Sequence, residues 1–389
     1  MKPLRIAVIP GDGIGPEVVA QGLKVLRATL GSEGLRTEVF PWGCQYYLDT
    51  GRMMPEDGLA RLREFDAIYL GAVGDPRVPD AVSLPGLLLA IRRGFDQYVN
   101  LRPVRLLPGV PTPLAGRGPV DIDMLFVREN VEGEYAGAGG RLYRGVGEGV
   151  ADEGEVALQT GVFTRRGIGR VMEYAFALAV RTGKPLCSVS KANALNHAFT
   201  LWDEVFREKA ADPRFAGAGT GAGAGEGVRA ETLLVDAAAL QMVRNPGRFG
   251  VVVASNLFGD ILTDLGAALA GGLGFAAGAN LNPEGRYPSM FEPVHGSAPD
   301  IAGRGVANPI AAIWAAAMLL EHVGRGEAAR RVMAAIEAVA RQPRYWTPDV
   351  AEAAGVAAGT GTAGGARATT EQVGDAVAEV VARGGGGEA

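Results

Sequence analysis

Short apolar runs alternate with segments of helical periodicity along most of this chain. Strands are predicted where β-branched and aliphatic residues cluster between turn residues, at 4–10, 37–40, 66–71, 100–104, 121–128, 185–190, 232–236 and 251–253. Helices are predicted where apolar residues recur every three or four positions, at 17–30, 87–95, 164–181, 257–274, 307–320 and 371–382. Loops are expected at 72–85, 212–229, 282–300 and 351–366, and a hairpin arm in the glycine-rich stretch 137–161. The alternation indicates an α/β protein.

One stretch, residues 251–274, combines a buried-type strand with a helix that carries acids. Asp260 and Asp264 are four residues apart, so their carboxylates lie on one helical face. Neighbouring carboxylates repel unless a cation lies between them, and Mg²⁺ or Mn²⁺ prefers oxygen ligands. Asp236 also follows a predicted strand, at the end where α/β sheets bind ligands. A metal site is one hypothesis, and acids that merely suit the positive end of a helix are the alternative.

Three arginines, Arg92, Arg102 and Arg128, each lie at or near the end of a predicted element. A planar guanidinium binds a carboxylate through two parallel hydrogen bonds, so three that converge would hold a dicarboxylate. Three unrelated surface arginines remain the alternative. Lys191 follows the predicted strand 185–190 and is a candidate for chemistry, although a solvated lysine at a helix start is the more common situation. The glycines of residues 11–15 fit G-x-G-x-x-G badly, because the third comes one residue early, and they do not predict a Rossmann domain.

Composition narrows the class of protein further. The chain has 389 residues, 48% apolar and 21% charged, which suits a soluble globular protein of two ordinary domains. No apolar run approaches the ~18–20 residues that span a bilayer, and the N-terminus lacks signal-peptide features, so we expect a cytoplasmic protein without a membrane partner. Cys44 and Cys187 match no metal or redox spacing. The net charge of −5 argues against nucleic-acid binding.

Six stretches, in this order along the chain, together resemble the β-decarboxylating dehydrogenases, the family of isocitrate, 3-isopropylmalate, homoisocitrate and tartrate/D-malate dehydrogenases. They are IPGDGIGPEV (9–18), NLRPVR (100–105), VRENVEGEY (127–135), SKANAL (190–195), SNLFGDILTD (255–264) and EPVHGSAPDIAG (292–303). Within the family, residues 42–58, 92–116, 127–135 and 281–301 are most similar to the tartrate/D-malate branch. The chain departs from that branch at 81–85, where Ala81 and Pro85 replace an expected histidine and aromatic residue. Because this loop lies near the variable group of the substrate, the exact substrate stays open.

The resemblance implies an isocitrate/isopropylmalate dehydrogenase-like two-domain α/β fold rather than an ordinary Rossmann domain. Residues 1–97 and 258–389 would form a large, NAD-binding domain, and residues 98–257 a small domain with dimerisation elements and the arm near 137–161. The implied protein is a homodimer with shared active sites. Its implied activity is the NAD- and metal-dependent oxidative decarboxylation of a small 2-hydroxy dicarboxylic acid, D-malate (to pyruvate and CO₂) and/or tartrate. The alternative substrate is 3-isopropylmalate, for which residues 87–89 offer an apolar wall, and a non-catalytic regulatory subunit is a further rival.

The resemblance also implies a role for each site residue. Asp260, Asp264 and Asp236 of the partner subunit would hold Mg²⁺ or Mn²⁺, with K⁺ as a further candidate cation. Arg92, Arg102 and Arg128 would hold the substrate carboxylates. Lys191, from the partner, would help to remove the hydroxyl proton, and Tyr135 would return a proton to the enol carbon.

The cofactor residues that the resemblance implies come from two stretches of the chain, one at residue 193 and one at residues 295–308. They are Asn193, His295, Gly296, Ser297, Ala298, Asp300 and Asn308. Among them, Asp300 predicts the choice of cofactor. A carboxylate accepts hydrogen bonds from the ribose hydroxyls and repels a 2′-phosphate, so we expect NAD rather than NADP.

Overall fold

The computed structural model describes residues 2–142, 155–216, 227–355 and 367–384. The strands are β1 (Leu4–Gly11), β2 (Leu35–Val39), β3 (Ala67–Ala72), β4 (Val99–Arg105), β5 (Asp123–Glu129), β6 (Gly133–Leu142), β7 (Val156–Val162), β8 (Leu186–Ser190), β9 (Ala230–Leu234), β10 (Val251–Ala254), β11 (Ala277–Leu281) and β12 (Ser289–Pro293). The α-helices are α1 (Gly15–Leu30), α2 (Cys44–Thr50), α3 (Gly58–Leu62), α4 (Asp80–Ser83), α5 (Leu89–Gly94), α6 (Arg165–Thr182), α7 (Ala198–Ala210), α8 (Val235–Arg244), α9 (Asn256–Leu269), α10 (Ile310–His322), α11 (Gly326–Ala340), α12 (Pro348–Ala353) and α13 (Thr370–Gly384). A π-helical turn, η1 (Leu84–Leu88), joins α4 to α5.

One mixed sheet organises the molecule. Its strand order is β2-β1-β3-β12-β11-β4-β5-β10-β8-β9. All neighbours are parallel except at β11, which is antiparallel to β12 and β4, and between β4 and β5. Residues 98–257 supply the run from β4 to β9, and the two chain ends supply the run from β2 to β11. The division of the chain into two domains, with its boundaries, stays a prediction.

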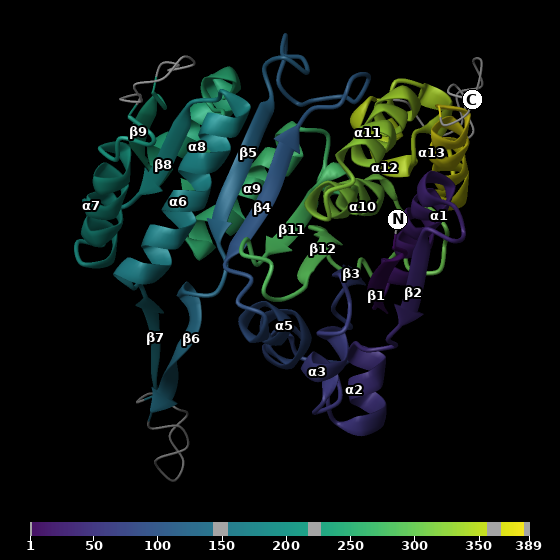
Figure 1. Cartoon of the computed structure of the whole chain (residues 1–389), viewed down its shortest axis with the longest axis horizontal. Coiled ribbons are helices and arrows are strands. Elements are labelled where there is room, and N and C mark those ends of the chain that lie inside the picture. The colour runs from purple at the N-terminus through teal and green to yellow at the C-terminus, as the bar shows by residue number, and fades with distance from the viewer. Residues whose placement is uncertain (1, 143–154, 217–226, 356–366, 385–389) are drawn as a thin grey trace.

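Helices cover the sheet and explain why its central strands are apolar. Strands β3, β8 and β10 are buried at every position, as expected for parallel strands that are covered on both faces. In Figure 1, α1, α10, α11 and α13 gather around one half of the sheet, and α6, α7, α8 and α9 around the other. Helix α10 is buried almost all round, which its alanine-rich sequence permits.

Most predicted elements form, and the mixed α/β fold is confirmed. The expected loop at 282–300 is wrong in part, because Met290 and Phe291 lie buried in β12 between β3 and β11. The expected loop at 72–85 contains α4 and the start of η1. Helices α7 and α11 were not predicted. Of the loops expected at 212–229 and 351–366, residues 217–226 and 356–366 lie outside the described residues.

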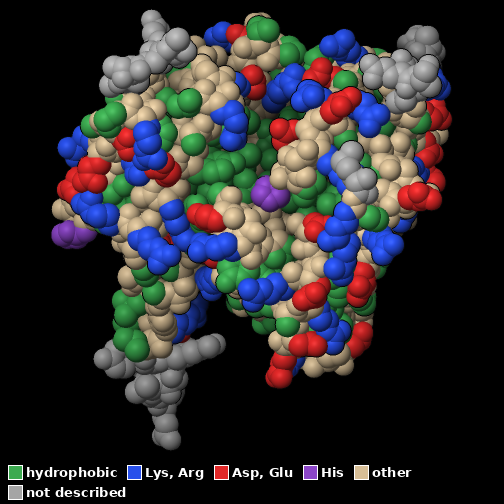
Figure 2. All heavy atoms as spheres, viewed as in Figure 1, with side chains coloured by type: hydrophobic (Ala, Val, Ile, Leu, Met, Phe, Trp, Pro, Cys, Tyr) green, Lys and Arg blue, Asp and Glu red, His purple; other side chains and the backbone are tan. Residues whose placement is uncertain are grey.

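The predicted hairpin arm is present as the antiparallel pair β6 and β7, which projects from the body (Figure 1). Every residue of β7 is exposed. On the face shown in Figure 2, basic and acidic side chains are interspersed over the body. Among the described helices, none has both the length and the apolar content that a membrane crossing requires.

Candidate active site

Three buried arginines from three different elements converge on one cavity. Arg92 comes from α5, Arg102 from the middle of β4 and Arg128 from the end of β5, and each is at most 6% exposed. With Asp260 and Glu292 they line a cavity of about 260 Å³. Three guanidiniums therefore face two carboxylates in this lining. The excess of positive charge suits an anionic ligand.

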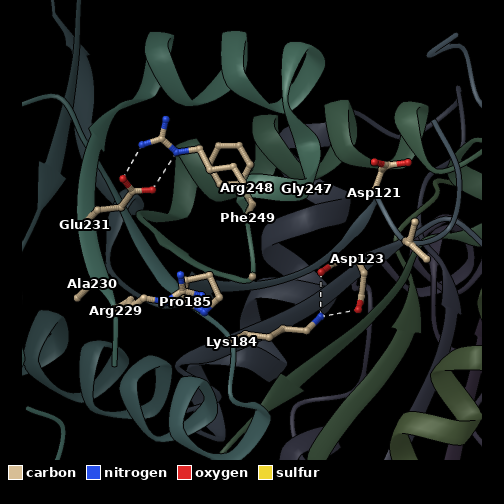
Figure 3. Close-up of a pocket in the computed structure, with 12 residues that line it drawn as sticks. Asp121, Asp123, Lys184, Pro185, Arg229, Ala230, Glu231, Gly247, Arg248 and Phe249 are labelled. Carbon is tan, nitrogen blue, oxygen red and sulfur yellow. Dashed lines mark hydrogen bonds and ion pairs between the residues drawn. The ribbon is translucent and has the colours of Figure 1, made fainter. Parts of the chain in front are cut away.

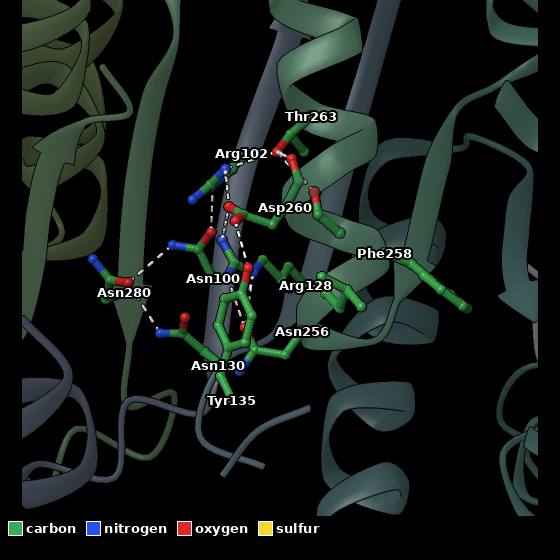
Figure 4. A network of polar contacts seen from close by, with 12 residues as sticks. Asn100, Arg102, Arg128, Asn130, Tyr135, Asn256, Phe258, Asp260, Thr263 and Asn280 are labelled. Atoms are coloured by element: carbon green, nitrogen blue, oxygen red, sulfur yellow. Dashed lines mark hydrogen bonds and ion pairs between the residues drawn. The ribbon is translucent and has the colours of Figure 1, made fainter. Parts of the chain in front are cut away.

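Asp260 contacts two of the three arginines and also Tyr135 (Figure 4). Its Oδ1 accepts a hydrogen bond from Nη1 of Arg128 and lies 3.3 Å from Nη1 of Arg102, and its Oδ2 accepts one from the Tyr135 hydroxyl at 2.9 Å. Burial alone would raise the pKa of Asp260, but the charges of Arg128 and Arg102 outweigh burial and hold the pKa below its ordinary value. Ser255 caps the start of α9 by accepting from the Phe258 amide, so α9 begins at the end of β10 and carries Asp260 to the cavity.

Neutral amides and a hydroxyl fix the two arginines nearest to Asp260. Arg128 donates to Oδ1 of Asn256 from Nε (3.1 Å) and from Nη2 (2.7 Å). Arg102 donates from Nε to Asn100 at 2.6 Å and from Nη1 to Thr263 at 2.7 Å. Burial lowers the pKa of both guanidiniums, which still remain protonated at neutral pH. Because their partners are mostly uncharged, the arginines keep positive charge for a ligand.

Sequence reasoning missed the residues that hold Arg92. Its Nη2 donates to Oε1 of Glu292 at 2.8 Å, and the same carboxylate oxygen accepts from Asn280 at 2.8 Å. Oδ1 of Asn280 in turn accepts from Asn100 and Asn130, which links Arg92 to the rest of the network (Figure 4). Glu292 lies inside the quoted stretch 292–303, but nothing local marks it as an arginine partner.

Tyr135 lies against Arg128 as well as Asp260. The guanidinium of Arg128 stands over the Tyr135 ring, 5.4 Å from its centroid. Burial, and then the Asp260 charge, raises the pKa of the Tyr135 phenol, so the hydroxyl keeps its proton at neutral pH. Tyr135 thus lines the cavity with a protonated hydroxyl that donates a hydrogen bond to Asp260.

Asp264 follows Asp260 by one turn of α9 and is exposed. Burial of part of the carboxyl raises its pKa against the opposing charge of Arg102, and the Asp260 charge adds to the increase. In the described part of one chain, no three His, Cys, Asp or Glu side chains lie close enough to bind a metal ion. The pair Asp260 and Asp264 still fits Mg²⁺ or Mn²⁺, because such ions often use one or two carboxylates and fill the other positions with water or substrate oxygens.

Lys191 and Asp236 form a separate pair away from the arginines. Nζ of Lys191 donates to Oδ1 of Asp236 at 2.7 Å, between the end of β8 and the first turn of α8. The hydrogen bond from Lys191 lowers the pKa of the exposed Asp236 carboxyl. Neither residue lines the arginine cavity. A single chain therefore does not bring the predicted catalytic lysine and the third predicted metal ligand together with Asp260.

The predicted cofactor segment joins the same cavity at His295 and Gly296. Nε2 of His295 is buried without a hydrogen-bond partner among the described residues, and burial lowers the pKa of the imidazole, which keeps it neutral. Ser297 accepts a hydrogen bond at its carbonyl from the Ile14 amide at 2.8 Å. A Cβ at Gly13, whose φ is +57°, would lie 2.0 Å from that carbonyl, so this position requires glycine. The glycine loop after β1 (residues 11–15) and the segment after β12 (residues 295–298) therefore pack against each other and form one wall beside the arginine cavity.

The other predicted cofactor residues are placed differently. Ala298 has a φ of +40°, a backbone conformation that is uncommon outside glycine and typical of ligand-contact loops. Asp300 and Asn193 are exposed. Asn308 is buried, and its Oδ1 accepts from the Ile310 amide at 3.0 Å, so part of its side chain already serves the start of α10.

A larger cavity, of about 800 Å³, lies at the amino ends of β5, β8, β9 and β10 (Figure 3). Its charged groups largely pair with one another, Lys184 with Asp123 at 2.7 Å and Arg248 with Glu231 at 3.0 Å. Parallel sheets bind ligands at the opposite, carboxyl ends of their strands. The smaller, arginine-lined cavity is therefore the candidate active site.

This α/β fold and its arginine-lined site have a known family counterpart. The model of the isocitrate/isopropylmalate dehydrogenase family matches residues 5–377, so the chain belongs to that family. Its members act as decarboxylating dehydrogenases on hydroxy acids, and this chain is an oxidoreductase of that kind.

Curated relatives with three different names match nearly the whole chain. A probable tartrate dehydrogenase/decarboxylase of Agrobacterium vitis is 47% identical and covers 98% of this chain and 99% of its own. The decarboxylating D-malate dehydrogenase of Escherichia coli K12 is 49% identical, with 98% and 100% covered. A 3-isopropylmalate dehydrogenase of Thermobifida fusca is also 49% identical, with 98% of both chains covered. Among solved structures, isocitrate dehydrogenase of Methylococcus capsulatus superposes with a TM-score of 0.82 at 35% identity, over 97% of this chain and 99% of that one.

Proposed function

We propose that this protein catalyses the NAD- and divalent-metal-dependent oxidative decarboxylation of a small 2-hydroxy dicarboxylic acid, D-malate (to pyruvate and CO₂), tartrate or both. The observation that carries the proposal is the cavity in which Arg92, Arg102 and Arg128 surround Asp260 and Tyr135. In the reaction, the 2-hydroxyl group is oxidised to a ketone: the hydroxyl proton leaves, and bound NAD would supply the acceptor for the hydride lost from C2. The carboxylate on the carbon next to the new ketone then departs as CO₂, and the electron pair of the broken C–C bond forms an enolate, which takes up a proton at carbon.

The arginines would bind and orient the substrate. Each guanidinium is held on one side by a protein group, Arg102 by Asn100, Arg128 by Asn256 and Arg92 by Glu292, and faces the cavity on the other side. It can therefore bind a substrate carboxylate while keeping these hydrogen bonds. A carboxylate held by charge-assisted hydrogen bonds is also free to depart once it becomes neutral CO₂. Leu88 and Leu89 add apolar surface to the lining, which would limit the access of water to a bound substrate.

The proton steps fall to Tyr135 and to the partner subunit's Lys191. Tyr135 keeps its proton at neutral pH and lies in the cavity, where it can return a proton to the enol carbon. Asp260, Asp264 and the partner's Asp236 would hold the divalent cation. When bound, such a cation supplies positive charge beside the substrate oxygens, which favours loss of the hydroxyl proton.

The wall formed by residues 295–298 and the glycine loop would hold NAD. The unpartnered Nε2 of His295 is a polar group that a ligand can satisfy, and the close packing of Gly13 on the Ser297 carbonyl fixes the backbone beside it. Asp300 at the end of this wall would accept from the ribose hydroxyls. These features support NAD as the cofactor.

The surface of α8 and α9 supports a homodimer with shared active sites. Leu240 on α8 is 53% exposed and lies one turn after Asp236, and Ile261 on α9 is 58% exposed and lies one turn before Asp264. The apolar positions and the metal-ligating acids therefore share the same exposed faces. A second copy packed there would cover the leucine and isoleucine and bring its Asp236 and Lys191 towards this chain's Asp264.

A second candidate substrate, 3-isopropylmalate, is favoured by one specific feature. Leu84, Leu88 and Leu89 line the same cavity as Arg92, and an apolar wall suits an alkyl group better than a hydroxyl. Leu87, which the sequence also suggested for this wall, is instead fully buried in the core. The alkyl substituent would replace the hydrogen or hydroxyl at C3, and the chemistry would stay the same.

A substrate panel tests the proposal. The purified chain is given D-malate, the tartrate stereoisomers, 3-isopropylmalate or isocitrate, with NAD or NADP and with Mg²⁺, Mn²⁺ or a chelator. We expect NADH formation with D-malate or a tartrate, dependent on the metal. A higher kcat/KM for 3-isopropylmalate would select the second candidate, and no turnover with any of these acids would contradict the proposal.

A further inference from the structure

The stretch of chain that leads from β5 into β6 is bound to two helices by the carboxylates of Glu132 and Glu134. Glu132 accepts hydrogen bonds from the backbone amide (3.0 Å) and the hydroxyl (2.8 Å) of Thr164, which caps α6. Glu134 accepts from the Ser255 hydroxyl at 3.1 Å and from the Leu257 amide at 3.2 Å, at the start of α9. A negative charge near a helix N-terminus is stabilised there, so both contacts hold the segment firmly.

Glu134 is the neighbour of Tyr135, and the two contact the same helix at successive turns. Leu257, which donates to Glu134, precedes Asp260 by three residues, and Asp260 accepts from the Tyr135 hydroxyl at 2.9 Å. Adjacent side chains of a regular strand point to opposite faces, so both can reach α9 only if the strand is irregular. The pairing of β6 with β7 indeed changes register between Gly133 and Ala138.

We propose that Glu134 is a positioning residue for Tyr135, a role that rests on the proposed function of Tyr135 as a proton donor. The carboxylate anchors β6 to the start of α9 and thereby sets the distance from the Tyr135 hydroxyl to Asp260 and to the substrate. The backbone here is also held by three side-chain donors. Asn256 donates to the Glu132 carbonyl at 3.0 Å, Gln159 to the Glu134 carbonyl at 3.1 Å, and Arg93 to the Tyr135 carbonyl. Among these contacts, the Glu134 carboxylate is the one that joins the residue next to Tyr135 to the start of α9.

A double-mutant cycle distinguishes positioning from simple capping of α9. The variants are Glu134→Ala, Tyr135→Phe and the double variant, with kcat and KM measured on the best acid of the panel and melting temperature measured in parallel. We expect Glu134→Ala to lower kcat by about 10- to 100-fold with little change in KM, since a displacement of about 1 Å has effects of this size. In the Tyr135→Phe background, the same change should alter kcat by no more than about twofold, because the group that Glu134 positions is already absent.

Two further variants serve as controls. Glu134→Gln keeps an oxygen acceptor and should restore most of the kcat lost in Glu134→Ala, and it also serves if the alanine variant does not fold. Glu132→Ala removes the matched anchor on α6 and should lower the melting temperature without lowering kcat.

Three results would overturn the inference. An equal loss of kcat on Glu134→Ala in both backgrounds would assign Glu134 to the stability of α9. Wild-type kcat in Glu134→Ala would show that Tyr135 needs no such anchor. Wild-type kcat in Tyr135→Phe would contradict the proton-donor role in the proposed function, and with it this inference, so the two failures are distinguishable.

Discussion

Replacement of Arg102 by lysine tests the binding role of the arginine cavity. Arg102 is 6% exposed, and its guanidinium uses Nε for Asn100 and Nη1 for Thr263, while Asp260 lies 3.3 Å from Nη1. Nη2 donates to no protein group among the described residues and is the atom expected to bind a substrate carboxylate. Lysine keeps the charge but has one nitrogen, so it cannot make these contacts together.

The expected loss follows from the contacts removed. A hydrogen bond between charged groups contributes about 1.5–3 kcal/mol, which corresponds to a decrease of roughly 10- to 160-fold in kcat/KM. Stability should decrease by about 1–3 kcal/mol, because the contacts to Asn100 and Thr263 are weakened and not replaced. Initial-rate kinetics and urea unfolding of the same preparations measure the two effects.

The matched control lies on the same strand. Arg105→Lys changes a partly exposed arginine that pairs with Glu337 outside the cavity, at 2.7 Å. We expect this variant to differ from the parent by less than about 0.5 kcal/mol in stability and not to differ in kcat/KM. If Arg102→Lys behaves like Arg105→Lys in kinetics, then Arg102 does not bind the substrate and the assignment of the cavity is wrong.

Three other predictions concern the cofactor, the substrate pocket and pH. Asp300→Lys should reduce kcat/KM for NAD by about tenfold or more and improve use of NADP, since it removes an acceptor for the ribose hydroxyls; an unchanged ratio of the two cofactors would refute the assignment. Leu88→Ser should lower kcat/KM for 3-isopropylmalate by about tenfold relative to that for D-malate, because only 3-isopropylmalate has an alkyl group that would contact Leu88 in the cavity lining. Equal decreases for the two acids would show that Leu88 does not face the substituent. Burial raises the pKa of Glu129 from 4.5 to about 7, so the folded state retains a proton that the unfolded chain has released, and the free energy of unfolding should fall as pH rises between these two values. Glu129→Gln should reduce that fall in urea unfolding measured from pH 4.5 to 8, and an identical pH dependence in both proteins would contradict the raised pKa.

Much of the site was predictable because its signals are local or lie in continuous motifs. The strand and helix around residue 256 follow from a β-branched run and a helical period, which place Asp260 and Asp264 on one face. The convergence of the arginines came from the family resemblance, since spacing left unrelated surface arginines open.

The rest depended on contacts between distant parts of the chain. Asn100 and Asn280 meet only because β4 pairs with β11, across 180 residues of sequence. The prolines and glycines that flank β12 are typical of a loop, so the strand was not predicted. Its pairing with β3 and β11 determines its extended conformation. The loop expected at 72–85 ends at Pro85, but Pro85 lies within the first turn of a π-helix, where a missing amide is tolerated. Lys191 and Asp236 cannot be placed at the cavity by one chain at all.

A heterodimer with one altered acid in each protomer tests the central claim most directly. A protomer with Asp260→Asn and a protomer with Asp236→Asn are produced together with different tags, and the mixed dimer is purified on both. Each variant homodimer should be inactive. If Asp260 of one protomer works with Asp236 of the other, the mixed dimer has one intact site and should show about half of the parent activity. A mixed dimer as inactive as either variant homodimer would contradict the shared site.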